Sequence, residues 1–146
     1  MRLLVDGDSC PVLNIIEKTA EKLRIELVIY SDICHNINLN YGKMVKLDNR
    51  NQEVDMAIYN DCKENDIIIT NDYGLAELIL GKNAYVINHN GRQYTDKNIE
   101  QLLMKRHQHA KIIRSGGRHQ THKKRDHEND KIFKNKLLSL IQSIQE

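Results

Sequence analysis

Leu3-Leu4-Val5-Asp6-Gly7-Asp8, near the start of the chain, consists of three apolar residues followed directly by two carboxylates. The apolar run predicts a short buried strand that presents Asp6 and Asp8 at its C-terminal end. Asp66-Ile67-Ile68-Ile69-Thr70 is the clearest buried strand in the chain, and Asp72 follows it by two residues. Because ligands of open α/β sheets bind outside the carboxyl ends of the strands, these acids mark the expected site.

Strands and helices are expected to alternate outward from these two strands. Apolar residues at helical spacing predict a helix through residue 23, with Pro11 in its first turn and Ser9 or Cys10 near its N-cap. The other expected strands are 25–30, 44–47 and 84–87, and the other expected helices are 52–63, 75–80 closed by Gly81, 95–106 capped by Thr95 or Asp96, and 131–145. This order predicts a three-layer α/β/α fold with a mainly parallel central sheet, in a single domain spanning 1–146.

Composition narrows the class of protein. A chain of 146 residues fits one domain, and a core without Trp and with one Phe must be largely aliphatic. The three cysteines show no disulfide or zinc spacing, so they are expected to be reduced thiols. The apolar run at the start is too short for a signal peptide, and no run reaches the length of a membrane span. We therefore expect a cytoplasmic protein with no membrane partner.

The positive charge is concentrated in one part of the chain. The whole chain carries +2, but residues 105–125 contain eight Lys or Arg and no acid, which leaves −6 for the rest. Together with its histidines, the segment 105–127 is expected to bind RNA or another phosphate polyanion without base stacking, since it lacks aromatic residues. The residues expected to contact phosphate are Arg114, Gly116, Gly117, Arg118, Lys123, Lys124 and Arg125.

The acidic residues predict a metal site. Asp55, in the helix expected at 52–63, joins Asp6, Asp8 and Asp72 as the fourth candidate. Clustered carboxylates raise one another's pKa, and a hard divalent cation such as Mg²⁺ or Mn²⁺ removes that cost and activates water for phosphodiester hydrolysis. Simpler interpretations are that Asp8 and Asp72 cap helices and that Asp55 is a solvated charge. His35 is either a loop histidine or a substrate contact.

Several blocks of the sequence resemble the YaiI/YqxD family. The blocks are Leu3-Leu4-Val5-Asp6-Gly7-Asp8-Ser9-Cys10-Pro11-Val12, with Ser9 in place of the usual alanine, Glu53-Val54-Asp55-Met56-Ala57-Ile58, Asp66 to Ala76, Tyr94-Thr95-Asp96-Lys97-Asn98-Ile99 and Arg114-Ser115-Gly116-Gly117-Arg118. The resemblance implies a PIN-like fold, similar to metal-dependent ribonucleases, and by matching position it selects Asp6, Asp8, Asp55 and Asp72. The chain departs from the pattern at Asn51-Gln52-Glu53, where many relatives have a glycine and a further acid.

Three functions follow from these features. The leading one is a metal-dependent nuclease, acting on RNA, in which the four aspartates hold the metal and orient water. The second is a phosphatase similar to the haloacid dehalogenases, in which Asp6 attacks phosphorus and Asp8 is the acid/base. The third is a non-catalytic RNA- or ribosome-associated module whose binding depends on the basic segment alone.

Overall fold

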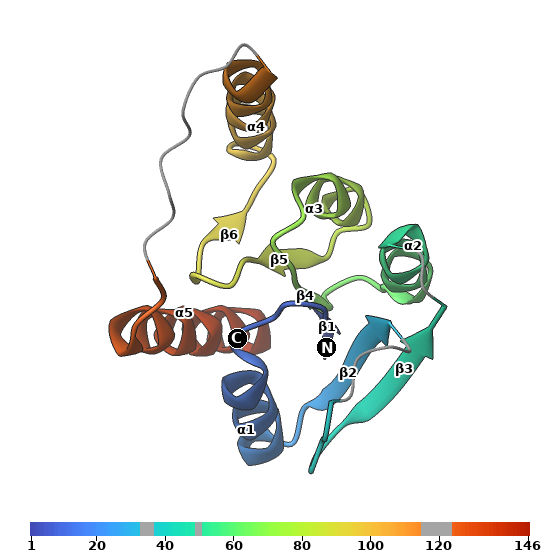
Figure 1. The fold of residues 1–146 in the computed structure, drawn as a ribbon. Coiled ribbons are helices and arrows are strands. Elements are labelled where there is room, and N and C mark those ends of the chain that lie inside the picture. The colour runs from blue at the N-terminus through green and yellow to red at the C-terminus, as the bar shows by residue number, and fades with distance from the viewer. Residues whose placement is uncertain (33–36, 49–50, 115–123) are drawn as a thin grey trace.

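The computed structural model describes residues 1–32, 37–48, 51–114 and 124–146, and strands and helices alternate along most of this chain (Figure 1). The elements in chain order are β1 (Arg2–Asp6), α1 (Leu13–Leu23), β2 (Glu26–Asp32), β3 (Lys43–Leu47), α2 (Asn51–Asp61), β4 (Ile67–Ile69), α3 (Tyr73–Leu80), β5 (Tyr85–Ile87), β6 (Gln93–Tyr94), α4 (Ile99–Arg114) and α5 (His127–Gln145). This alternation confirms the predicted α/β class.

One sheet of six strands forms the centre, in the order β3-β2-β1-β4-β5-β6. All neighbours are parallel except β5 and β6, so the predicted mainly parallel sheet is confirmed. The short edge strand β6 was not predicted. It pairs with β5 through a turn at Asn90-Gly91, in which Gly91 adopts φ +88 and its N–H donates to the Asn88 carbonyl at 3.1 Å.

The two faces of the sheet are covered by different helices. Along β1 and β4, the side chains of Leu3, Val5, Ile67 and Ile69 point into a core shared with α1 and α5. The alternate residues, such as Leu4, pack with α2, α3 and α4 on the other face. Because a strand buried on both faces has no solvent side to alternate with, these strands are continuous apolar runs in the sequence.

Several helix boundaries differ from the sequence predictions. α1 begins at Leu13 after an N-cap at Val12 that makes no side-chain cap bond, so Pro11 precedes the helix and neither Ser9 nor Cys10 caps it. α4 runs to Arg114, eight residues beyond the predicted end, and takes the first half of the basic segment into a helix. α5 begins four residues earlier than predicted. The cause is a capping box that Asp126 forms with Asn129.

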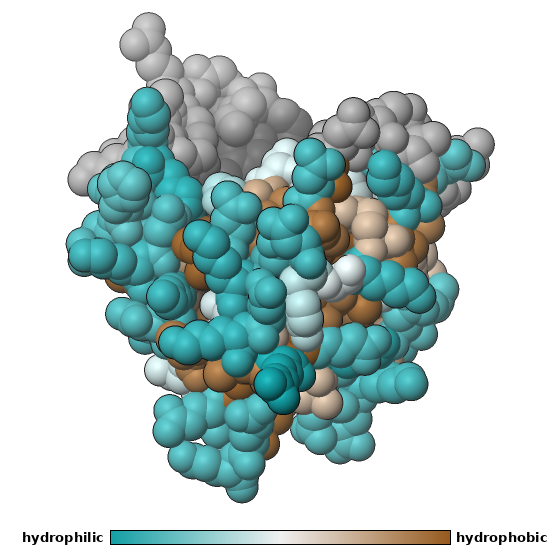
Figure 2. Space-filling view, turned by 90° about the horizontal axis from the view of Figure 1, so that it is seen from below, coloured by the Kyte–Doolittle hydropathy of each residue, from teal (hydrophilic) through white to brown (hydrophobic). Residues whose placement is uncertain are grey.

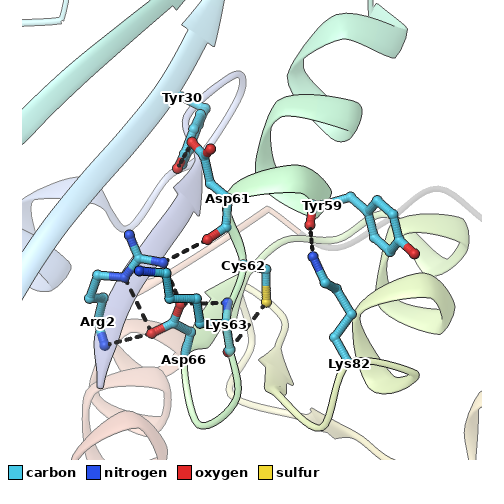
Figure 3. A network of polar contacts seen from close by, with 8 residues as sticks. All are labelled: Arg2, Tyr30, Tyr59, Asp61, Cys62, Lys63, Asp66 and Lys82. Atoms are coloured by element: carbon cyan, nitrogen blue, oxygen red, sulfur yellow. Dashed lines mark hydrogen bonds and ion pairs between the residues drawn. The ribbon is translucent and has the colours of Figure 1, made fainter.

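A polar network joins the N-terminal ends of β1 and β4, at the sheet edge opposite the predicted site (Figure 3). The Asp66 side chain is 3% exposed and accepts hydrogen bonds from the Arg2 backbone N–H at 3.0 Å, from Arg2 Nη2 at 2.7 Å and from the Lys63 N–H at 2.9 Å. Arg2 Nη2 also donates to the Asp61 carbonyl, and Tyr30 Oη donates to the Asp61 carboxylate at 2.7 Å. The network fastens the end of α2 to three strands.

The surface seen from below is mostly hydrophilic, and apolar residues appear between polar side chains (Figure 2). Among the described residues, no helix combines the length and the apolar character that crossing a membrane requires.

Candidate functional site

The candidate site lies at the point where the strand order of the sheet reverses direction. From β1 the chain adds β2 and β3 on one side, and from β4 it adds β5 and β6 on the other, so β1 and β4 are neighbours at the centre. Asp6 is the last residue of β1, and Thr70 follows the last residue of β4. Crevices at such points are where open α/β sheets bind ligands.

Asp6 is partly buried at the centre of this edge. Its Oδ2 accepts a hydrogen bond from Thr70 Oγ1 at 3.3 Å, and this bond spans 64 residues of sequence. Burial raises the pKa of Asp6 from 3.8 to about 6, with further increases from the negative charges of Asp8 and Asp72. The Thr70 hydroxyl opposes this shift because it stabilises the charged carboxylate.

Asp72 links the strand end to the following helix. It is the N-cap of α3, and its Oδ1 accepts from the Leu75 N–H at 3.1 Å. Its own N–H donates to Thr70 Oγ1 at 3.0 Å, so one buried hydroxyl contacts both Asp6 and the Asp72 backbone. The simpler interpretation of Asp72 as a cap is therefore confirmed. The same carboxylate also contributes to the electrostatic field at Asp6.

Asp55 reaches this group from α2, on the helical layer above the sheet. Burial raises the pKa of Asp55 to about 6, and the nearby negative charges of Asp72 and Asp6 raise it further. Asp55 is thus an interacting member of the cluster and not an isolated solvated charge.

Asp8 completes the group and does not cap α1. Its Oδ1 accepts from Ser31 Oγ and from the Asp32 N–H, each at 3.2 Å, at the C-terminal end of β2. Gly7 permits this arrangement because a Cβ there would lie 2.7 Å from Ile29 Cγ2 and 3.1 Å from the Tyr30 carbonyl. All four predicted aspartates therefore lie at one edge of the sheet, joined by hydrogen bonds or by their mutual charges.

The raised pKa values give a direct test of this cluster. The unfolded chain releases these protons near its ordinary pKa of 3.8, whereas the folded protein holds them to about 6, so the metal-free protein loses stability as the pH rises through this range. We expect ¹³C NMR to show two aspartate carboxyl groups titrating near pH 6, and both to shift to lower pH when Mg²⁺ is added. Titration of every aspartate below pH 4.5, roughly the ordinary upper range, would contradict the cluster.

The donor set suits a hard cation that keeps several water ligands. Among the described residues, no group of three His, Cys, Asp or Glu side chains is already arranged as metal ligands. Within the same part of the chain, no Lys or Arg forms an ion pair with Asp6, Asp55 or Asp72, and the observed pairs are Arg2–Asp66 and Arg125–Asp130. Mg²⁺ is commonly held by one or two carboxylates plus water, so a closed set of three protein ligands is not a requirement for binding it.

The end of the basic segment, at Lys124 and Arg125, lies at the same edge of the sheet. Lys124 is exposed, whereas the Arg125 guanidinium donates to the His89 carbonyl at 2.8 Å, to Asn90 Oδ1 at 3.0 Å and to Asp130 at 2.7 Å. Arg125 thus anchors the start of α5 to the β5–β6 turn. The predicted contacts Gly116, Gly117, Arg118 and Lys123, the side chain of Arg114, and His35 lie outside what the structure describes.

Sequence reasoning missed three residues of this edge. The buried hydroxyl groups of Thr70 and Ser31 donate hydrogen bonds to Asp6 and Asp8, respectively. Thr70 directly follows a buried strand and Ser31 lies within one, and these positions could have identified both residues from the sequence. His89 is 7% exposed, and within the described chain its Nε2 has no hydrogen-bond partner. Burial and the nearby Arg125 charge lower the pKa of His89 to about 4, so this histidine is neutral at physiological pH.

Comparison with known proteins places the chain in a family. The model of the "Uncharacterized BCR, YaiI/YqxD family" matches residues 4–143. The UPF0178 protein of Clostridium tetani is 45% identical over 141 residues, which is 97% of each chain. UPF0178 proteins of Clostridium novyi and Ruminiclostridium cellulolyticum are 42% and 43% identical, covering 100% and 97% of this chain and 98% and 92% of their own. No solved structure gives a significant match. The chain belongs to the YaiI/YqxD family of bacterial proteins.

Proposed function

We propose that this protein is a divalent-metal-dependent ribonuclease that hydrolyses phosphodiester bonds at the Asp6, Asp8, Asp55 and Asp72 edge. The observation that carries the proposal is that carboxylates from separate elements raise one another's pKa at this edge. The pKa of Asp55, on α2, is raised to about 6 by burial and by the charges of Asp72 and Asp6, and the pKa of Asp6, on β1, is raised to about 6 by burial and by the charges of Asp8 and Asp72. Carboxylates held together at this cost to stability are typical of functional sites.

Mg²⁺ or Mn²⁺ is the cofactor that this oxygen-rich cluster suits. Asp6, Asp55 and Asp72 would hold the ion directly or through water, and a bound divalent ion polarises a phosphoryl oxygen and lowers the pKa of water. The chain itself supplies the positioning. The Thr70 hydroxyl fixes the Asp6 carboxylate, and Ser31 with the Asp32 N–H fixes Asp8, which would orient the attacking water.

RNA is the proposed substrate because two residues at the end of the cationic segment lie at the carboxylate edge. Lys124 and Arg125 line the same hollow as Asn71 and Tyr73, the two residues that flank Asp72. The segment 105–125 contains eight Lys or Arg and no acid, so phosphate contacts would dominate affinity and weaken with salt.

Asp55→Asn tests the proposal directly. With Mn²⁺ and a generic single-stranded RNA, the variant is expected to cleave at least about 100-fold more slowly than wild type, because it loses a ligand charge but keeps the size of the side chain. The matched control is Asp96→Asn, an equal change at an exposed aspartate, which is expected to cleave normally. EDTA should abolish RNA cleavage by both the wild type and Asp96→Asn.

Two outcomes separate the proposal from its alternatives. Equal cleavage by wild type and Asp55→Asn would assign the activity to a contaminant or to another site. Salt-sensitive RNA binding without any Mn²⁺-dependent cleavage would instead support the non-catalytic RNA-binding module.

A further inference from the structure

A polar hollow of about 650 Å³ is lined by the two residues that flank Asp72 in the sequence, although none of the four aspartates lines it. Asn71 and Tyr73 form part of its lining, and the residue between them is Asp72. The other walls come from the β5–β6 turn with Asn90 and from the first turn of α5 with Glu128. A volume of this size falls in the range of small-molecule sites.

The amide groups of the hollow are oriented by the fold. Asn71 Oδ1 accepts from the His89 N–H at 2.9 Å, and Asn90 Oδ1 accepts from Arg125 Nη1 at 3.0 Å. Each amide oxygen is therefore occupied, and among the described residues neither Nδ2 donates to a protein acceptor. The donors that these two asparagines offer to a ligand are their NH₂ groups.

The α5 side of the hollow supplies a carboxylate. Asp126 is used in the capping box of α5, whereas Glu128 is exposed, lines the hollow and makes no ion pair within the described chain. The Tyr73 ring is half-buried and is held edge-on against Tyr94, with ring centroids 5.6 Å apart. A fixed aromatic ring beside hydrogen-bonding groups is the usual arrangement for an unstacked base of single-stranded RNA.

We propose that this hollow binds a guanine base of single-stranded RNA whose neighbouring phosphate lies at the Asp6–Asp55–Asp72 cluster. Amide NH₂ groups match the O6 and N7 acceptors of guanine, and a carboxylate matches its N1–H and N2–H₂ donors. Uracil lacks the amino group and adenine lacks the O6 acceptor. The inference rests on the proposed ribonuclease function for the phosphate, but the base contacts depend on other residues.

Binding of labelled octamers in EDTA tests the inference without requiring cleavage. A uridine octamer with one central guanosine is expected to bind about tenfold more tightly than the all-uridine octamer, and inosine, which lacks the 2-amino group, should lose most of that gain. Glu128→Gln should remove the guanine preference and leave uridine binding unchanged. The matched control is Glu100→Gln, which alters an exposed glutamate in the first turn of α4.

Equal affinities for the guanosine and uridine octamers, or the same loss in Glu100→Gln, would overturn the guanine site. The outcomes also separate this inference from the proposed function. Guanine preference that depends on Glu128, without Mn²⁺-dependent cleavage, leaves the base site standing and removes the ribonuclease. Mn²⁺-dependent cleavage without preference for sites next to guanosine leaves the ribonuclease standing and removes the guanine site.

Discussion

Asp6→Asn is expected to abolish RNA cleavage and at the same time to stabilise the metal-free protein. Cleavage should fall on the order of 1,000-fold, the loss that follows removal of a central charge-stabilising group from an active site. The asparagine still offers an oxygen to the Thr70 hydroxyl, which donates to Asp6 Oδ2 at 3.3 Å in the wild type. The fold therefore keeps its hydrogen bond, while the repulsion among the carboxylates decreases.

The gain in stability has a defined pH dependence. The pKa of Asp6 is raised from 3.8 to about 6, so at pH 7.5 its ionisation destabilises the folded protein relative to the unfolded chain by about 3 kcal/mol, and asparagine does not incur this cost. Urea unfolding in EDTA should show the variant more stable at pH 7.5 and equal to wild type only below the unfolded pKa of 3.8, where Asp6 is protonated in both the folded and the unfolded state.

Mn²⁺ should reverse this order, because a bound ion stabilises the wild type and not the variant. A variant that is less stable than wild type at neutral pH without metal would show that Asp6 has a structural role. Such a result would contradict the proposal that the carboxylate cluster binds a cation.

Asp66→Ala is expected to lower the free energy of unfolding by about 3 kcal/mol. The Asp66 side chain is 3% exposed and accepts hydrogen bonds from the backbone N–H of Arg2, from Arg2 Nη2 and from the Lys63 N–H. Removing it leaves a partly buried guanidinium and two N–H groups without their partner. Urea unfolding at neutral pH measures the loss.

The surface ion pair between Arg125 and Asp130 provides the control for this prediction. The Asp130 side chain is 36% exposed, so Asp130→Ala should cost less than about 1 kcal/mol even though its N–O distance is also 2.7 Å. A similar small loss in both variants would show that burial does not set the energy of the Arg2–Asp66 network.

The sheet and the location of the carboxylates followed from local sequence. Buried strands of a parallel sheet are short apolar runs, and any acid directly after such a run must lie at the carboxyl edge, which is how Asp6 and Asp72 were placed. Asp55 required the additional condition that its helix packs on the same sheet. The family resemblance selected the same residues independently.

The details that were missed depend on contacts between distant segments. Asp8 pairs with Ser31 because β1 and β2 are aligned with Asp6 opposite Tyr30, and this register is not encoded within either strand. α4 continues to Arg114 through polar residues that show no clear apolar face in the sequence. The capping box at Asp126 moved the start of α5, although the first apolar residue of that helix comes later.

The adjacency of β1 and β4 also bears on biosynthesis. A ribosome delivers Asp6 and Asp8 before Thr70, the hydrogen-bond partner of Asp6, which is 64 positions further along the chain. A nascent chain therefore lacks the acidic centre until Thr70 has emerged and the distant strands have paired, a slow, non-local step. Under the proposed ribonuclease function, an unfinished copy would therefore be inactive toward the transcript that encodes it.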